Sequence, residues 1–258
     1  MLIDTHAHLF LENFDQDIAE VIEHARQKGV EMILLPHIDS ESTQAMLHLS
    51  FRYPGICFPM MGLHPGSVEE NYEDELDQMQ KNLKNHKFIA LGEIGMDLYW
   101  DKTFRQEQEI VFRKHLEWAK EYNLPLVIHS RNAVDELLKI LADFPPRTFR
   151  GVFHSFTGSL EEASKVLRAG FYIGIGGIIT FKNSGLDKMA LGVKPENILI
   201  ETDSPFLAPD PFRGKRNESA YLPYIVEKLA ELYGLTFNEV ADITTANAYK
   251  LFDIKAFK

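Results

Sequence analysis

The stretch "LIDTHAHLF" (residues 2–10) joins an apolar run to two histidines, His6 and His8, that stand two positions apart. Side chains alternate between the faces of a β-strand, so a strand through this stretch would point both imidazoles the same way. Such a pair is typical of metal ligands, but also of polar residues that leave a buried strand. Which of these two interpretations is correct depends on the side chains that the fold brings close to the histidine pair.

Seven more short apolar runs follow the first at roughly regular intervals. Near-continuous apolar runs indicate strands that are buried on both faces, as in parallel sheets. The eight runs are "MLID" (1–4), "EMILLP" (31–36), "GICFPMMG" (55–62), "FIALGE" (88–93), "PLVIHS" (125–130), "GVFHSF" (151–156), "GFYIGIGG" (170–177) and "NILIET" (197–202).

Segments with helical periodicity lie between the runs. One of them, 159–170, starts with a capping-box pattern and ends on a glycine. The predicted helices include 14–28, 103–122, 133–142, 159–170, 219–233 and 236–252. No linker or change in composition divides the chain. The sequence therefore predicts an α/β fold with β/α repeated eight times, a TIM-type (β/α)8 barrel in one domain over residues 1–258. An open, doubly wound sheet is the alternative.

Polar residues at the ends of the runs favour the barrel. Histidines and carboxylates follow or end six of the runs: His6, His8, His64, Glu93, His129, His154 and Asp203. In a parallel barrel the carboxyl ends of all strands form one rim, where active sites are built. An open sheet would hold its first and last strands far apart, whereas a barrel makes them neighbours. Only closure lets His6 and His8 meet Asp203.

Four imidazoles and two carboxylates are enough for two divalent ions that share a bridging carboxylate. The set comprises His6, His8, Glu93, His129, His154 and Asp203. Mixed nitrogen and oxygen donors suit Zn, Mn, Co or Ni and tolerate Mg, but do not suit a calcium cage. Asp203 can both ligate a metal and accept a proton from water. A single histidine at a strand end is more often a hydrogen-bonded loop residue than a metal ligand. For the whole set, however, that interpretation would require five separate strands each to have a polar end by coincidence.

Composition limits the function classes. The chain has 258 residues and a net charge of −11, and the first 100 residues carry 6 Lys or Arg against 17 Asp or Glu. This acidity argues against a protein that coats duplex DNA non-specifically, but it leaves room for a local cationic site. A single cysteine, Cys57, excludes an internal disulfide. With no signal-peptide pattern and no apolar stretch long enough for a membrane span, the sequence predicts a cytoplasmic protein without membrane contact.

Eight motifs taken together resemble the TatD-type metal-dependent deoxyribonucleases of the amidohydrolase-like superfamily. The motifs are "IDTHAH", "GLHP", "LGEIGMDLYW", "LPLVIHSR", "FHSFTGS", "TFK", "ETDSPFLAP" and "RGKRNE", in order from residue 2 to about 252. The resemblance implies a (β/α)8 barrel, two divalent ions (Mg, Mn or Zn) and 3′→5′ exonuclease or related cleavage of DNA. It implies DNA, single-stranded or at 3′ ends, as the partner, and no obligate protein partner is evident.

Carried over position by position, the resemblance implies that His6, His8, Glu93 and Asp203 hold one metal. Glu93 would bridge to a second metal held by His129 and His154, and Glu93 and Asp203 would be the catalytic carboxylates. Amide-cleaving relatives use a carbamylated lysine as the bridge, and no lysine ends the fourth run here. The chain departs from the family pattern at "GLHPG", with Gly66, and at "HSF", with Ser155. These departures concern the substrate rim more than the ligands.

Substrate contacts are predicted at the rim and in one basic stretch, "FRGKRNE" (212–218). The candidates are His64, Arg131, Lys182, Arg213, Lys215 and Arg216. Surface ion pairs or solvated loops are the alternative roles for the basic residues. Tyr99 and Trp100 could stack a base or pack in the core. Two other functions stay open: a hydrolase of a small phosphoester, lactone or amide on the same barrel, and a binding barrel without catalysis.

Overall fold

The computed structural model describes residues 1–99 and 102–254, and its eight strands all run parallel to their neighbours. The strands are β1 (Leu2–Asp4), β2 (Val30–Leu35), β3 (Cys57–Pro59), β4 (Leu91–Asp97), β5 (Leu126–Arg131), β6 (Gly151–Phe153), β7 (Tyr172–Ile175) and β8 (Ile198–Ile200). Regular hydrogen-bonded ladders join the strands in sequence order, β1-β2-β3 in one group and β4-β5-β6-β7-β8 in the other. Each predicted run therefore contributes one strand, in the predicted order.

Hydrogen bonds across two seams join these ladders into a ring. At the first seam Met61 pairs with Leu91 in parallel, and the Gly92 N–H donates to the Met61 carbonyl at 3.0 Å. At the second seam, Ala7 pairs with Ser204, and the His8 N–H donates to the Ser204 carbonyl at 2.7 Å. The residues after β1 and those after β8 are thus neighbours, and the predicted barrel is confirmed.

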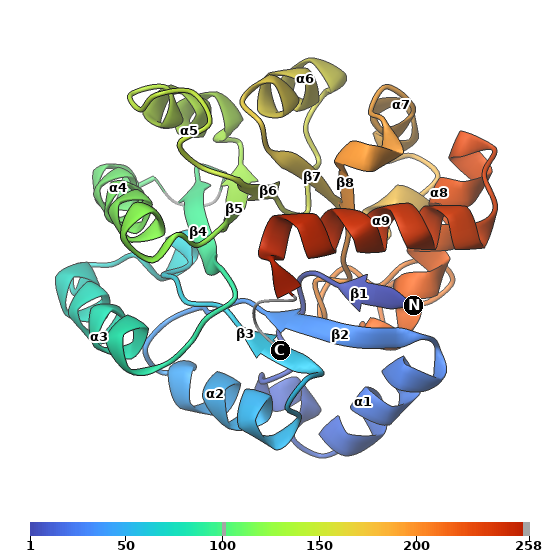
Figure 1. Cartoon of the computed structure of the whole chain (residues 1–258), viewed down its shortest axis with the longest axis horizontal. Coiled ribbons are helices and arrows are strands. Elements are labelled where there is room, and N and C mark those ends of the chain that lie inside the picture. The colour runs from blue at the N-terminus through green and yellow to red at the C-terminus, as the bar shows by residue number, and fades with distance from the viewer. Residues whose placement is uncertain (100–101, 255–258) are drawn as a thin grey trace.

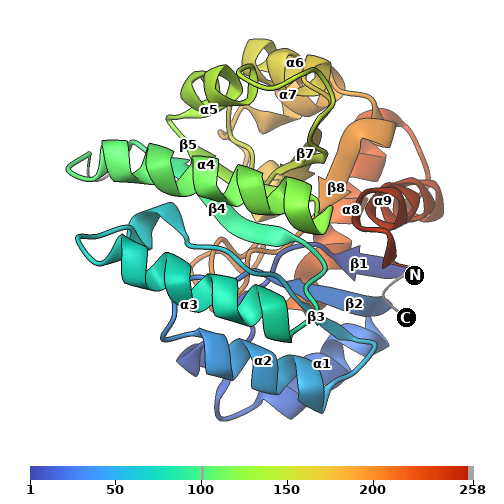
Figure 2. The same cartoon turned by 60° about the vertical axis from the view of Figure 1, so that its left-hand side comes forward.

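Helices surround the strands on the outside (Figure 1). They are α1 (Ile18–Gln27), α2 (Thr43–Arg52), α3 (Tyr72–Asn85), α4 (Arg105–Tyr122), α5 (Val134–Leu141), α6 (Leu160–Arg168), α7 (Leu186–Leu191), α8 (Leu222–Tyr233) and α9 (Phe237–Phe252). Figure 2 shows α3 and α4 side by side outside β3 and β4. The predicted capping box of α6 is present, with Ser159 and Glu162 exchanging hydrogen bonds. Among the described residues, no helix combines the length and apolarity that a bilayer crossing needs.

Strand β4 differs from its prediction in a way that matters for the site. The apolar run 88–93 was expected to end at Glu93, but β4 begins at Leu91 and continues to Asp97. Its register against β5 shifts between Leu91 and Ile94, and Gly95 pairs with His129. A Cβ on Gly95 would lie 2.1 Å from the His129 carbonyl oxygen, so only glycine permits this close pairing. Glu93 therefore lies inside the strand, below the level of His129.

The inside of the ring has its own apolar cluster, separate from the larger core between strands and helices. Ile3, Leu34, Met60 and Leu199 belong to it. Helix α9 crosses the amino ends of the strands, where its Asn247 side chain donates to the Ile198 carbonyl at 2.8 Å. Its last turn adds Leu251 and Phe252 to the cluster, and Ile254 follows. The amino end of the barrel is thus closed by apolar side chains, and polar residues gather at the opposite rim.

Truncating this closure should destabilise the barrel. Phe252 is 3% exposed, so Phe252→Ala is expected to lower the free energy of unfolding by about 3–5 kcal/mol through lost burial and a residual cavity. Urea unfolding followed by circular dichroism measures this change. The matched control is Phe51→Ala, because Phe51 is 68% exposed and should change stability by about 0.5 kcal/mol or less. Equal effects of the two substitutions would contradict a role for α9 in closing the barrel.

Candidate metal centre

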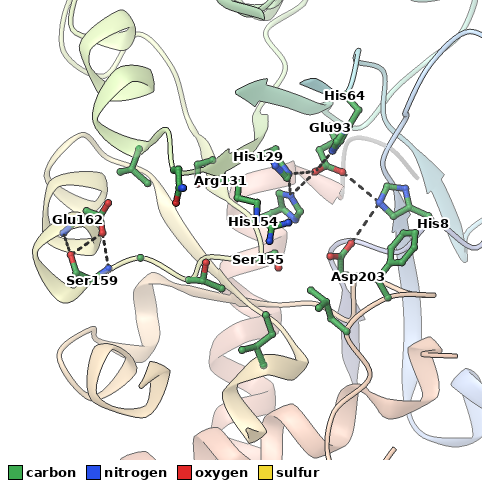
Figure 3. A pocket seen from close by; sticks show the side chains of 18 residues that line it. His8, His64, Glu93, His129, Arg131, His154, Ser155, Ser159, Glu162 and Asp203 are labelled. Atoms are coloured by element: carbon green, nitrogen blue, oxygen red, sulfur yellow. Dashed lines mark hydrogen bonds and ion pairs between the residues drawn. The ribbon is translucent and has the colours of Figure 1, made fainter. Parts of the chain in front are cut away.

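Six predicted side chains converge at the carboxyl rim of the barrel, as Figure 3 shows for five of them. They are His6, His8, Glu93, His129, His154 and Asp203. Their side chains range from fully buried at His6 to 17% exposed at His129. Strand β1 ends at Asp4, so His6 and His8 are not on a strand as the alternation argument assumed. The pairing of Ala7 with Ser204 nevertheless directs both rings to one point, with their Nε2 atoms 3.3 Å apart.

One carboxylate oxygen of Glu93 faces the two histidines that follow β1. Glu93 Oε2 lies 3.1 Å from His6 Nε2 and 3.5 Å from His8 Nε2. Asp203 Oδ1 lies 3.7 Å from His6 Nε2 and 3.6 Å from His8 Nε2. These four side chains form one compact group of nitrogen and oxygen donors.

The other carboxylate oxygen of Glu93 faces a second group. Glu93 Oε1 lies 2.8 Å from His129 Nδ1, 2.7 Å from His154 Nε2 and 3.4 Å from His64 Nε2. Figure 3 shows Glu93 with His129 and His154 on one side and His8 on the other. The groups adjoin, because the rings of His6 and His154 are stacked with centroids 3.9 Å apart.

The donors fit divalent cations by two observations. The Nε2 atoms of His6 and His8 face each other and a carboxylate, an arrangement that one cation between them would satisfy. The Nδ1 atoms of His6 and His8 are buried without a hydrogen-bond partner. Their Nε2 atoms face the carboxylates, so Nε2 is the ring nitrogen through which these two histidines would bind a cation.

Charges in the group are strongly coupled. Burial alone would raise the pKa of Glu93, but the imidazoles of His154, His64 and His6 outweigh it and hold that pKa well below its usual range. Burial would lower the pKa of His8, yet its hydrogen bonds and attraction to Asp203 and Glu93 raise it to about 9. The low pKa values of Glu93 and Asp203 favour ionised carboxylates, and the raised pKa of His8 favours a proton on its ring, whereas burial lowers the pKa of His6. A divalent cation held by these side chains would displace the proton of His8.

A buried network holds Asp203 in place. Asp4 is fully buried and accepts hydrogen bonds from the Thr202 N–H at 2.9 Å and the Thr202 hydroxyl at 2.6 Å. Burial raises the pKa of Asp4 to about 7 against the effect of these bonds. Asp203 itself adopts φ = 59°, a left-handed conformation that is uncommon outside glycine and that the network sustains. The end of β8 is thus fixed to the end of β1 beneath the candidate metal ligands.

Two further carboxylates contact histidines of the donor groups. Asp97 Oδ2 lies 3.0 Å from His129 Nε2, so His129 bridges Asp97 and Glu93. Glu201 is fully buried, accepts from the Ser155 N–H, and has Oε1 3.5 Å from His154 Nδ1. Such partners fix ring orientation and raise the basicity of a metal-bound imidazole. Sequence reasoning missed Asp97, although Glu93 and Asp97 have the same parity along β4 and that parity could have revealed it.

Two buried histidines outside the centre hold the backbone that presents His64. His37 contacts the Gly62 carbonyl through Nδ1. His115 Nε2 accepts from the Leu63 N–H at 3.2 Å, while its Nδ1–H donates to the Val111 carbonyl at 2.7 Å. His64 Nδ1 then accepts from the Gly66 N–H at 2.9 Å, which leaves Nε2 directed at Glu93. Gly66, a departure from the family pattern, therefore fixes the ring of His64.

The pH dependence of stability should report the role of His115. Burial lowers the pKa of His115 from 6.5 to about 4. Below pH 6.5 its imidazole therefore binds a proton in the unfolded chain but stays neutral in the folded protein. The contribution of His115 to the free energy of unfolding is therefore fully present above pH 6.5, and about 3 kcal/mol of it is lost as the pH drops towards 4. Unfolding free energies of the protein and of His115→Gln should differ in slope in this window. Exposed His48→Gln is the control, and identical slopes for all three proteins would contradict the assignment.

The predicted substrate residues separate into two sets. His64 and Arg131 line the cavity beside the centre, which has a volume of about 440 Å³. Arg131 also lies over the ring of Tyr99, 4.1 Å from its centroid. The remaining basic candidates, Lys182, Arg213, Lys215 and Arg216, are not among the lining residues. Arg216 forms a two-point ion pair with Asp17 and donates to the Asn13 carbonyl, so its charge is engaged elsewhere. Trp100 lies outside the described residues.

A parallel barrel with imidazoles and carboxylates clustered at its carboxyl rim defines a metal-dependent hydrolase of the TIM-barrel class. The family described as TatD related DNase matches residues 3–253, and the chain belongs to this family. The metal-dependent hydrolase YabD of Bacillus subtilis, described as uncharacterized, is 41% identical over 98% of this chain and 100% of its own. The 3′-5′ ssDNA/RNA exonuclease TatD of Pectobacterium parmentieri is 33% identical over 97% of this chain and 99% of its own.

A solved structure supports the same assignment. The TatD homologue YjjV from Escherichia coli matches with a TM-score of 0.91 and 32% identity over 98% of both chains. The predicted family and the predicted hydrolase class are therefore confirmed. The binding barrel without catalysis is set aside, because the relatives are named as metal-dependent hydrolases.

Proposed function

We propose that this protein hydrolyses phosphodiester bonds of DNA and removes nucleotides from the 3′ ends of single strands. The observation that carries the proposal is the position of Glu93, whose two oxygens face two groups of donors beside a cavity. Two divalent ions that share a carboxylate are suited to in-line displacement at phosphorus. The name of the Pectobacterium relative, an exonuclease on single-stranded DNA and RNA, supports this class of substrate.

His6, His8 and Asp203 would hold one ion with Glu93 Oε2, and His129 and His154 would hold the second with Glu93 Oε1. When bound, such ions acidify a water molecule and stabilise negative charge on the phosphate and the leaving oxygen. Asp97 and Glu201 orient His129 and His154 from behind. His64 Nε2, 3.4 Å from Glu93 Oε1, borders the second group and would contact the phosphate or the ion.

Asp203 would take the proton from the attacking water, because its carboxylate lies at the mouth of the first group and is held ionised. The water oxygen would form a bond to phosphorus and the bond from phosphorus to the 3′ oxygen would break. The proton that Asp203 has taken would pass to the leaving 3′ oxygen, which gives a shortened strand with a 3′ hydroxyl and a released nucleotide with a 5′ phosphate. Arg131, the last residue of β5, would contact a non-bridging phosphate oxygen from the cavity wall.

The size of the cavity supports action at a strand end. Its volume of about 440 Å³ falls within the range of small-molecule sites, roughly 300–1,000 Å³. Such a space takes the terminal nucleotides of a strand rather than a length of duplex. Its lining includes hydroxyl and amide side chains, namely Ser130, Asn132, Ser155, Thr157 and Ser159.

A second candidate function is hydrolysis of a small phosphoester, lactone or amide. The observation that favours it is the scarcity of lysine and arginine, since Arg131 is the one such side chain among the described residues that line the cavity. A single phosphate needs no more than one such contact, whereas polynucleotide binding generally uses a basic groove.

A polarity-labelled digestion decides between the two. The protein is stripped with a chelator, reloaded with Mg, Mn or Zn, and incubated with single-stranded DNA labelled at one end. A 5′ label should give a ladder of shortened strands, and a 3′ label should give free mononucleotide from the start, in both cases only after reloading. Intact strands beside rapid turnover of a lactone or small phosphoester would overturn the proposal in favour of the second candidate.

A further inference from the structure

Two exposed apolar side chains, Phe206 and Leu207, form part of the cavity wall next to Asp203. Phe206 is 51% exposed and Leu207 40% exposed. Single exposed apolar residues are ordinary on a protein surface. These two differ because they are consecutive and line the same cavity as His8, Glu93 and Asp203.

The backbone that carries them is held firmly from below. Asn217 is fully buried, and its side-chain amide donates to the carbonyls of Phe206 and Thr202, both at 2.7 Å. A Cβ on Gly177 would lie 2.2 Å from the Leu207 carbonyl oxygen, so the two segments are in close backbone contact. Leu207 has φ = 53°, a conformation that costs free energy for a residue other than glycine. The two side chains are therefore presented in a fixed position.

The ring of Phe206 lies next to the metal centre. Its centroid is 6.1 Å from that of His8, with the two rings inclined at 67°. The edge-on contact with His8 leaves about half of Phe206 exposed, and Phe206 is one of the residues that line the cavity. A nucleotide whose phosphate meets the metal ligands carries its base one sugar away, within reach of an aromatic ring in this position.

We propose that Phe206 and Leu207 form a nucleobase subsite for the nucleotide whose phosphate is attacked. The inference rests on the proposed phosphodiesterase function and specifies how its substrate is held. Stacking on an aromatic ring tolerates every base, because every base has a π face. The subsite thus compensates for the scarcity of cations in the cavity: it binds through the base and leaves Arg131 to bind phosphate.

A base-free phosphate has nothing to place on this wall, which makes the subsite testable by binding alone. The probes are dAMP and 2-deoxyribose 5-phosphate, titrated calorimetrically into the metal-loaded protein. The native protein should bind dAMP roughly ten-fold more tightly than the sugar phosphate, as stacking of one base provides. Phe206→Ala should lose most of this preference without changing the affinity for the sugar phosphate.

Three more variants separate stacking from other effects. Phe206→Tyr keeps an aromatic face and should keep the preference. Phe206→Leu keeps apolar bulk against His8 but offers no aromatic face. This variant should lose most of the preference for dAMP even when its metal content is unchanged. Phe51→Ala, an exposed phenylalanine on α2, should behave as the native protein.

Equal affinity of the native protein for dAMP and 2-deoxyribose 5-phosphate would overturn the subsite. So would a Phe206→Ala protein whose affinities for the two probes fall by the same factor. If the base preference holds while labelled strands stay intact, the subsite stands and the exonuclease proposal fails. If strands are shortened without any base preference, the subsite alone is wrong.

Discussion

Glu93→Gln is expected to lose most of the bound metal and roughly 10³-fold or more of the hydrolytic rate. Glu93 is 2% exposed and contacts donors from both groups, so each group depends on one of its two oxygens. Glutamine has the same shape but offers one carbonyl oxygen and an amide that cannot ligate. One group would lose its Glu93 oxygen donor whichever way the amide turned, and the other would keep only an uncharged carbonyl oxygen. Several kcal/mol of charge stabilisation at the reacting phosphate would be lost with it.

Metal content after dialysis, measured by mass spectrometry, checks the first part, and the labelled-strand assay checks the second. Glu41→Gln is the matched control, because Glu41 is exposed in the chain and lies outside the donor groups. The control should retain both the metal and the rate. A Glu93→Gln protein with native metal content and native turnover would show that Glu93 is not the shared carboxylate.

Much of this centre could be predicted from sequence because the barrel imposes a simple rule. The carboxyl ends of parallel strands meet at one rim, so His6, His8 and Asp203 could be placed together from their positions after the first and last runs. The rule does not depend on local conformation. It held even though His6 and His8 lie beyond β1 rather than on it.

Features that depend on exact register were not predictable. Apolar patterning placed the end of the fourth strand at Glu93, whereas β4 continues to Asp97. The cause is a register shift between Leu91 and Ile94, together with the close pairing of Gly95 to β5, which hydrophobicity does not report. The contact of Asp97 with His129 follows from this extension of β4 beyond Glu93.

Ion pairs between segments far apart in the chain could not be predicted from the sequence either. Arg216 was a candidate for substrate binding because it stands in a basic stretch, but its guanidinium pairs with Asp17, which lies 199 positions earlier in the chain. The two buried histidines His37 and His115 lie outside the donor groups and make structural contacts. Their contacts with Gly62 and Leu63, which support His64, depend on how the segments after β2 and β3 and helix α4 pack together.

Asp203→Asn should separate proton transfer from metal binding. Asparagine keeps a carbonyl oxygen near His6 and His8 but is no longer a base, so kcat is expected to fall roughly 10²–10⁴-fold. KM should change much less, because the phosphate contacts proposed for Arg131 and His64 stay intact. The exposed residue Asp242 on α9 provides the control Asp242→Asn, which should keep native kinetics.

The pH profile sharpens this test. Burial by itself raises the pKa of Asp203, but the hydrogen bond from His8 and the charges of His6 and His154 outweigh it and lower that pKa. The base form therefore persists through the neutral range, and the deficit of Asp203→Asn should be constant there. The ion proposed for His129, His154 and Glu93 should be retained, since these histidines contact Glu93 Oε1 and not the oxygen that faces Asp203 and its neighbours. Loss of all metal from Asp203→Asn would mean that Asp203 acts as an essential ligand, and equal strand cleavage by both proteins would remove it from the mechanism.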